Sequence, residues 1–415
     1  MDKTIFEVEI SNSGPKSYET ATVMKMPASF AEFSDALQKA RIKDGKSCKN
    51  ELTCICCSGL THAMVGQNVN LYELNLFALR LAALTEEQKI GMAALLEIEH
   101  ERRRAPIPLD RLINLTYNTD ACCFAPQVSN HEELGAFLYA SEMLSNEAMA
   151  LLDTTEEGSG FRERLLELLG EQHQEDHGGV FTDFGYAELG GEIKDIYAYR
   201  PGETLYCGGC GAPVTLEVSK GFFNDPQYDS SDVTTLNLPF NDEAVWQVVD
   251  NVDAASLKEC AFHCVDCLIP SLRDAINDAI DDEDGIEQAD EFAQRLAQIE
   301  REWPESDMVR YKALLSTVDH PSLLDATQMM GEINQYELRP EVAQTWGYAE
   351  MVFQEKYPDL PEELFQTPQA AQIGQKMLDE RLGAITEYGL IRRKDGQPLP
   401  AFQSEQEIGQ GLEMM

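Results

Sequence analysis

The chain has 415 residues, of which 43% are hydrophobic, so it is long enough for two or more folded domains. Its 73 acidic and 32 basic residues give a net charge of −41, with −14 over residues 1–200 and −27 over residues 201–415. This excess argues against direct binding to nucleic acid or anionic lipid and favours a basic protein partner. No apolar run reaches about 18 residues and the N-terminus is not a signal peptide, so we expect a cytoplasmic protein that does not contact membranes.

Apolar alternation and three-to-four spacing predict a mixed α+β chain. In the first half we expect strands at 4–10 and 21–28, helices at 30–42, 71–84, 86–104 and 133–144, and an extended piece at 181–191. In the second half we expect strands at 212–220 and 234–240, helices at 242–252, 287–303, 306–318 and 341–353, and an extended piece at 385–396.

The two halves share short phrases in the same order. VMKMPASFAEF at 23–33 matches TLNLPFNDEAV at 235–245, and FTDFGYAELGG near 181 matches ITEYGLIRRKDG near 385. Collinear matches indicate a tandem duplication, although coincidence among short apolar and acidic words is the alternative. Each copy would contain a small α+β domain, a helical bundle and a second small α+β domain. The predicted domains are a first module at 1–200, the start of a second module at 201–285, its remainder at 286–400 and a flexible tail at 401–415.

Two Cys-x-x-Cys pairs predict a structural zinc site in the second module. Four thiolates in such pairs suit the tetrahedral geometry of zinc, and a reducing compartment disfavours disulfides. The predicted ligands are Cys207, Cys210, Cys264 and Cys267. A redox dithiol and unliganded buried cysteines are the alternatives, and His263 could replace one thiolate. In the first module Cys48, Cys54, Cys57 and His62 are candidates for a second metal site, which the sequence leaves open.

A zinc-dependent deaminase is an alternative of another class. His173 and Glu175, followed by Cys207 and Cys210, resemble the His-x-Glu and Cys-x-x-Cys pattern in which Glu moves protons. Tyr206 replaces the proline of that pattern, the His-x-Glu lies in a polar run with no clear helix, and Cys264 and Cys267 would have no role. The chain has no P-loop, no Gly-x-Ser-x-Gly and no His-Glu-x-x-His. We therefore expect no catalytic residues.

Carboxylates are dense and almost unaccompanied by lysine in the last part of the first module. Duplex DNA carries one charge per about 1.7 Å, so such a surface could act as a decoy for a DNA-binding groove, although a solvated helix face is the alternative. Arg102 to Arg104 and Arg392 to Lys394 are expected to pair with nearby carboxylates. The predicted decoy residues are Glu132, Glu133, Glu142, Glu147, Asp153, Glu156, Glu157, Glu171, Glu175, Asp176, Asp183 and Glu188, with Asp281, Asp282, Glu283 and Asp284 in the second module.

The order of elements over about residues 5–200 resembles the ArdA antirestriction proteins of conjugative elements and phages. The segments that carry the resemblance are MKMPASFAEFSDALQKARI, NLYELNLFALRLAALTEEQ, PIPLDRLINLTYNTD, ELGAFLYASEML and GGVFTDFGYAELGGEI. The resemblance implies an elongated, non-enzymatic DNA mimic that occupies the DNA site of a type I restriction-modification complex. It does not cover the cysteine pairs or the second copy. Another DNA-binding defence system, such as a CRISPR effector, is the alternative target, and the chain is expected to act as a pseudo-dimeric monomer or as a homodimer.

Overall fold

The computed structural model describes most of the chain. The described residues are 4–12, 17–43, 49–54, 70–103, 105–198, 211–222, 225–226, 233–282, 284–359, 361, 365 and 367–400. Contacts divide the chain into two compact units, of which unit 1 comprises Met1–Val8, Lys25–Pro27 and Glu51–Tyr206, and unit 2 comprises Glu9–Met24, Ala28–Asn50 and Cys207–Met415. Among the described residues, no helix has the length and apolar character needed to cross a bilayer.

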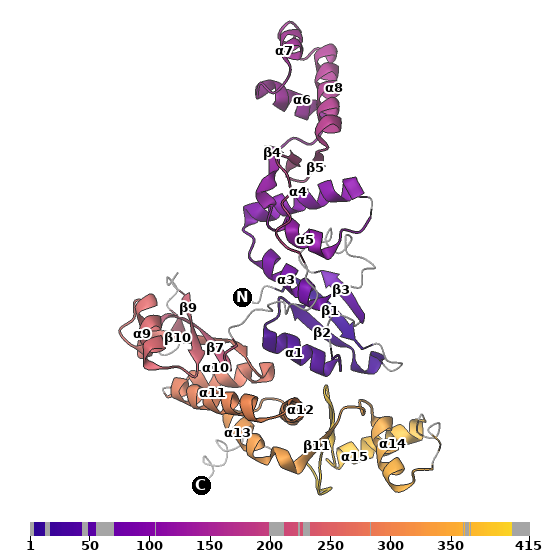
Figure 1. The fold of residues 1–415 in the computed structure, drawn as a ribbon, viewed down its shortest axis with the longest axis vertical. Coiled ribbons are helices and arrows are strands. Elements are labelled where there is room, and N and C mark those ends of the chain that lie inside the picture. Colours follow the sequence, from indigo (N-terminus) through magenta and orange to yellow (C-terminus); the bar gives the residue numbers. More distant parts are fainter. Residues whose placement is uncertain are drawn as a thin grey trace, which may run out of the picture. The chain divides into compact units, whose positions relative to one another are not determined.

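The first half of the chain alternates small sheets with helices (Figure 1). Its elements are β1 (Phe6–Ser11), η1 (Ser17–Thr20), β2 (Thr22–Met26), α1 (Phe30–Lys39), β3 (Lys49–Cys54), α3 (Leu71–Ala82), α4 (Glu86–Arg103), α5 (Leu109–Leu115), η2 (Thr119–Ala121), β4 (Cys122–Pro126), α6 (His131–Ala140), α7 (Asn146–Asp153), α8 (Gly160–His177), β5 (Val180–Thr182) and β6 (Gly185–Leu189). The sheets have the orders β2-β1-β3 and β4-β6-β5.

The second half follows with a similar alternation. Its elements are β7 (Val214–Phe222), β8 (Asp225–Pro226), β9 (Val233–Leu238), α9 (Asp242–Asn251), η3 (Leu257–Glu259), β10 (Cys260–Cys267), η4 (Pro270–Leu272), α10 (Arg273–Ile280), α11 (Gly285–Glu302), α12 (Glu305–Leu315), α13 (Leu323–Glu332), η5 (Ile333–Gln335), β11 (Tyr336–Arg339), α14 (Thr345–Lys356), α15 (Pro368–Asp379), β12 (Ala384–Thr386) and β13 (Gly389–Arg393). Here β7 pairs with β8, β9 and β10, and the last sheet has the order β11-β13-β12. The mixed α+β class is confirmed.

One continuous core runs through unit 2. It joins the inward faces of β7 and β9 to α11 and α12, and then to Tyr336 and Ile391 in the last sheet. The spacing of Phe292, Leu296 and Ile299 places one apolar stripe of α11 in this core.

In unit 1 the sheet β4-β6-β5 separates two smaller clusters. Ala187 and Val180 pack against Ala94 and Ile98 of α4, whereas Tyr186 packs in a separate cluster with residues of α6. Successive residues of β6 therefore face opposite sides of the sheet. This alternation decides which β6 side chains lie on the same side as Tyr186.

Candidate functional site

Local sequence signals position the helical cluster α6, α7 and α8. Asn130, Ser145 and Ser159 are N-caps whose side chains each accept a backbone N–H, and Gly178 ends α8 in the left-handed conformation with φ 64°. A Cβ added at Gly170 would lie 2.0 Å from the carbonyl oxygen of His131, so α6 and α8 can pack this closely only with glycine at this position. The three helices are neighbours in Figure 1.

This cluster carries a dense set of carboxylates. Residues 131–177 contain twelve acidic residues and only two basic ones, both arginines. The exposed members are Glu132, Glu133, Glu142, Glu147, Asp153, Glu156, Glu157, Glu163, Glu171, Glu175 and Asp176, and Glu167 is half-buried. All ten predicted decoy residues in this segment are therefore at the surface, on α6, α7, α8 and their connections.

The two arginines are engaged within the cluster. Arg162 donates to the carbonyl of Leu152 and lies over the Tyr139 ring at 4.9 Å, and Arg164 pairs with Glu167 at 2.5 Å. Because Arg162 donates to a backbone carbonyl and Arg164 pairs with Glu167, which is not one of the predicted decoy carboxylates, the surface keeps a strong local excess of negative charge.

Some of these carboxylates are held in the ionised form by local hydrogen bonds. The backbone N–H and hydroxyl of Ser129 donate to Glu133 and, with Asn130, hold the pKa of Glu133 below its usual value. Tyr139 donates its hydroxyl to Asp153 at 2.5 Å. Glu133 is therefore held as a hydrogen-bond acceptor, and Tyr139 fixes the position of the Asp153 side chain.

The remaining predicted decoy residues lie in different environments. Asp183 is exposed in the β5–β6 turn, and Asp281, Asp282 and Asp284 are exposed between α10 and α11. Glu283 lies outside the described residues. Glu188 is half-buried on β6 and its Oε2 atom lies 2.7 Å from Nε2 of His173, so it is engaged within the fold.

A His-His-Glu cluster in unit 1 was missed from the sequence. His173, His177 and Glu188 bring one possible ligand atom each within 4.8 Å of one another. The expectation of no clear helix at His173 was wrong, since α8 runs from Gly160 through His177. The four-residue spacing of the two histidines was the available signal, but recognising the contact with Glu188 requires the packing of α8 on β6.

The cysteine pairs are only partly within the described residues. Cys207 and Cys210 lie outside them, as do Cys48, Cys57 and His62, while Cys54 ends β3. Cys264 and Cys267 are buried on β10, and burial raises the pKa of Cys264 to about 12. Val214 pairs with Cys267, and the carbonyl of Pro213 accepts from the N–H of Leu268, so the chain that follows Cys210 runs beside the second pair. The four-cysteine zinc site stays a prediction.

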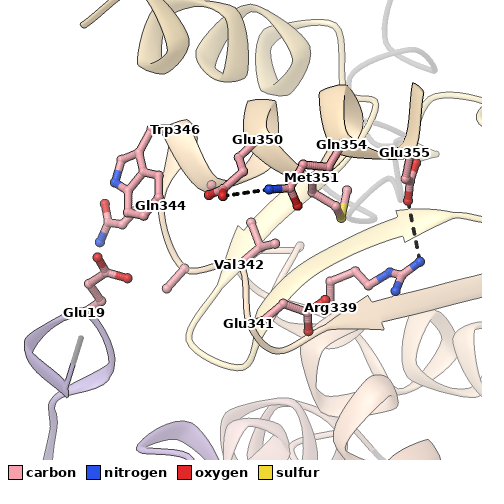
Figure 2. A pocket seen from close by; sticks show the side chains of 12 residues that line it. Glu19, Arg339, Glu341, Val342, Gln344, Trp346, Glu350, Met351, Gln354 and Glu355 are labelled. Atoms are coloured by element: carbon pink, nitrogen blue, oxygen red, sulfur yellow. Dashed lines mark hydrogen bonds and ion pairs between the residues drawn. The ribbon is translucent and has the colours of Figure 1, made fainter. Parts of the chain in front are cut away.

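Unit 2 contains a pocket of about 490 Å³ that Figure 2 shows from close by. Its charged and aromatic lining consists of Glu19, Glu341, Glu350, Glu355, Arg339 and Trp346. Arg339 pairs with Glu355 at 3.6 Å, and the charges of Glu19 and Glu341 act on Arg41, whose pKa is nevertheless lowered by burial. Since cations already balance part of this lining, its negative excess is smaller than that of the α6–α8 cluster.

Three arginines of the short basic clusters are paired with carboxylates, as expected, whereas Lys394 donates to the backbone carbonyl of Asn334 at 2.9 Å. Arg103 binds Glu99 at 2.7 Å, Arg392 binds Glu337 at 2.5 Å, and Arg393 binds Asp395 at 2.7 Å. Arg104 lies outside the described residues. These arginines therefore form no free basic patch of the kind that holds a phosphate backbone.

No protein-family model matches the chain, and no curated protein or solved structure is significantly similar to it.

Proposed function

We propose that the protein is a non-enzymatic inhibitor that mimics DNA and occupies the DNA-binding groove of a type I restriction-modification complex. The observation that carries this proposal is the surface of α6, α7 and α8, where eleven carboxylates are exposed and the only two basic residues are engaged within the cluster. A groove that binds DNA gains affinity when its cations pair with the closely spaced negative charges of the phosphates. Closely spaced, exposed carboxylates can supply similar charges.

We also propose that the chain is a tandem duplication of one module. Several matched features support it. The sheets β4-β6-β5 and β11-β13-β12 have the same order, and their last hairpins pair Thr182 with Gly185 and Thr386 with Gly389. The two threonine hydroxyls donate to the glycine carbonyls at 2.8 and 2.9 Å, and the glycines have φ of 129° and 126°.

Two further matches lie outside those hairpins. The first sheet of the first half has the order β2-β1-β3, and in the second half β7 likewise lies between β9 and β10, with the short strand β8 added. A Cβ added at Gly170 would lie 2.0 Å from the carbonyl oxygen of His131, at the start of α6. In the same way, a Cβ added at Gly374 would lie 1.8 Å from the carbonyl oxygen of Thr345, at the start of α14. An experimental structure in which residues 5–200 and 212–395 fail to superpose would overturn the duplication.

The decoy proposal is tested by competition with DNA on a purified type I restriction complex. A variant in which six carboxylates become amides should bind about 10- to 100-fold more weakly, because each exposed charge contributes a few tenths of a kcal/mol. The six positions are Asp153, Glu156, Glu157, Glu171, Glu175 and Asp176. A single change such as Glu156→Gln should have little effect, and inhibition by the wild type should fall steeply with salt.

The matched control exchanges Asp for Glu, and Glu for Asp, at the same six positions. It keeps the charge and should compete within about threefold of the wild type, because exposed side chains contribute mainly their charge. If the neutral variant folds and still competes as well as this control, the carboxylates do not mimic phosphates. If the wild type fails to displace DNA at all, a restriction complex of this type is not the target.

A further inference from the structure

His173, His177 and Glu188 form a compact cluster at the base of α8. His173 and His177 are one turn apart in the last part of the helix, their rings stack at 4.0 Å, and Glu188 faces them from β6. Nε2 of His173 lies 2.7 Å from Oε2 of Glu188, and these side chains are only 14% and 16% exposed. His177 is exposed, so one side of the cluster is open to water.

Hydrogen bonds orient two of the three groups in the way that metal sites require. Nδ1 of His177 lies 3.0 Å from the carbonyl oxygen of His173 and donates its proton there, which leaves Nε2 of His177 as a lone-pair donor. The hydroxyl of Tyr186 donates to Oε2 of Glu188 at 3.2 Å, which fixes the carboxylate. Such partners of the ligands set the tautomer and direction of a metal-binding side chain.

The electrostatic surroundings favour a cation. The C-terminal end of a helix carries partial negative charge, and His177 is the last residue of α8. Glu175 and Asp176 are exposed on the same turn. A divalent ion would replace one contact, the His173–Glu188 hydrogen bond, with bonds to all three groups.

We propose that His173, His177 and Glu188 bind a divalent zinc ion, with water at the fourth position. Two imidazoles and a carboxylate with one open position are an established ligand set for zinc, with bonds of about 2.0–2.2 Å. The ligand atoms need only small side-chain rotations, since all three already lie within 4.8 Å of one another. The ion ties the end of α8 to β6 and thus holds the base of the α6–α8 cluster. This site shares no residue with the predicted four-cysteine site.

The test uses the full-length chain, stripped of metal with a chelator and then titrated with Zn²⁺. His177→Gln is the main variant, because His177 is exposed and its loss should not disturb folding. His320→Gln, which removes an exposed histidine of unit 2, is the matched control. The wild type and the control should each bind one zinc ion more than His177→Gln, or bind that ion at least about 10-fold more tightly.

Zinc should also raise the melting temperature of the wild type and the control more than that of His177→Gln, because the ion binds only the folded site. Co²⁺ provides a second readout: bound at this site it should lack the intense thiolate-to-metal absorption. Equal zinc stoichiometry and affinity in wild type and His177→Gln would overturn the proposal. A thiolate absorption that disappears in His177→Gln would also overturn it, because His177 would then share its metal with cysteines.

Discussion

Replacing Lys312 by methionine should destabilise unit 2 by about 3–5 kcal/mol, the usual cost of removing one partner from a buried ion pair. Lys312 is 3% exposed, and its Nζ atom lies 2.9 Å from Oδ1 of Asp35, which is 6% exposed. The same oxygen accepts the hydroxyl of Tyr388 at 2.7 Å, and Lys39 lies 3.2 Å from Oδ2. The cluster fastens α1 to α12 and to the β12–β13 turn within unit 2.

The pKa of Asp35 gives the sign of the pH dependence. Burial alone would raise this pKa, but the charges of Lys312 and Lys39 and the hydrogen bonds outweigh it, so the folded pKa lies below the usual value. The contribution of Asp35 is therefore complete above the unfolded value of about 4 and is lost as the pH falls through the lower folded pKa. The deficit of Lys312→Met should be largest near neutral pH and shrink in acid, where Asp35 is protonated.

Urea unfolding followed by tryptophan fluorescence measures this effect in unit 2 alone, since all three tryptophans, Trp246, Trp303 and Trp346, belong to it. Lys376→Met is the control: Lys376 is 78% exposed and lies 3.9 Å from Glu380, so its loss should cost less than about 0.5 kcal/mol. Adding Asp35→Leu and Tyr388→Phe to Lys312→Met should recover most of the loss. If Lys312→Met is no less stable than Lys376→Met, the buried pair does not hold α1 in place.

Two further predictions concern packing and metal. Gly170→Ala and Gly374→Ala should each cost about 1–3 kcal/mol in thermal unfolding, because their Cβ atoms would meet backbone carbonyls at 2.0 and 1.8 Å, whereas Gly331→Ala, in an open position on α13, should be neutral or stabilising. If Gly170→Ala and Gly374→Ala unfold like Gly331→Ala, the close approach of these helices is wrong. Protein purified without chelators should contain zinc at the four-cysteine site, and Cys264→Ser should lose it and lower the melting temperature of unit 2, while Cys123→Ser, at an exposed position, should not. Absence of zinc from the purified wild type would remove that site.

Local patterns predicted most of the elements, because the spacing of apolar residues within a short segment indicates a strand or an amphipathic helix. Alternation found β1, β2, β7 and β9, and helical spacing found α1, α3, α4, α11 and α12. The pattern failed at α8, where Leu166 and Gly170 are the only buried residues in 18, so the helix has little apolar periodicity. The sequence of such a helix resembles a polar loop. The contact between the histidines at its end and Glu188 on β6 therefore could not be predicted.

Contacts between distant segments could not be predicted from such patterns. Asp35 and Lys312 are 277 positions apart, and nothing near either residue indicates that α1 groups with unit 2. The contact between His173 and Glu188 depends on the side of the sheet that β6 presents to α8, which one shift in register would reverse. The density of charge, in contrast, needed no knowledge of contacts, because it follows from composition, although composition could not show that Glu188 is half-buried against His173.

If the chain is a duplication, the two copies have distributed their charge differently. Residues 30–103 contain ten acidic and nine basic residues, whereas the matching residues 242–315 contain nineteen acidic and six basic ones. The last parts show the opposite trend: residues 131–177 have twelve acidic and two basic residues, and residues 345–379 have six and two. A solubilising coat would need no such exchange, because net charge alone would serve it.

We propose that, under the decoy hypothesis, the second copy contributes a decoy surface of its own. The acidic residues between α10 and α11 belong to the strongly acidic front of the second copy, where Asp281, Asp282 and Asp284 are exposed. Changing these three to asparagine should therefore weaken competition with DNA although the α6–α8 surface is intact, and combined with the six-fold neutral variant the losses should add as free energies. The contrary result would be a three-fold variant that competes with DNA as well as the wild type while the six-fold variant is impaired. The decoy would then be confined to the first copy, and these three aspartates of the second copy would have no role in inhibition.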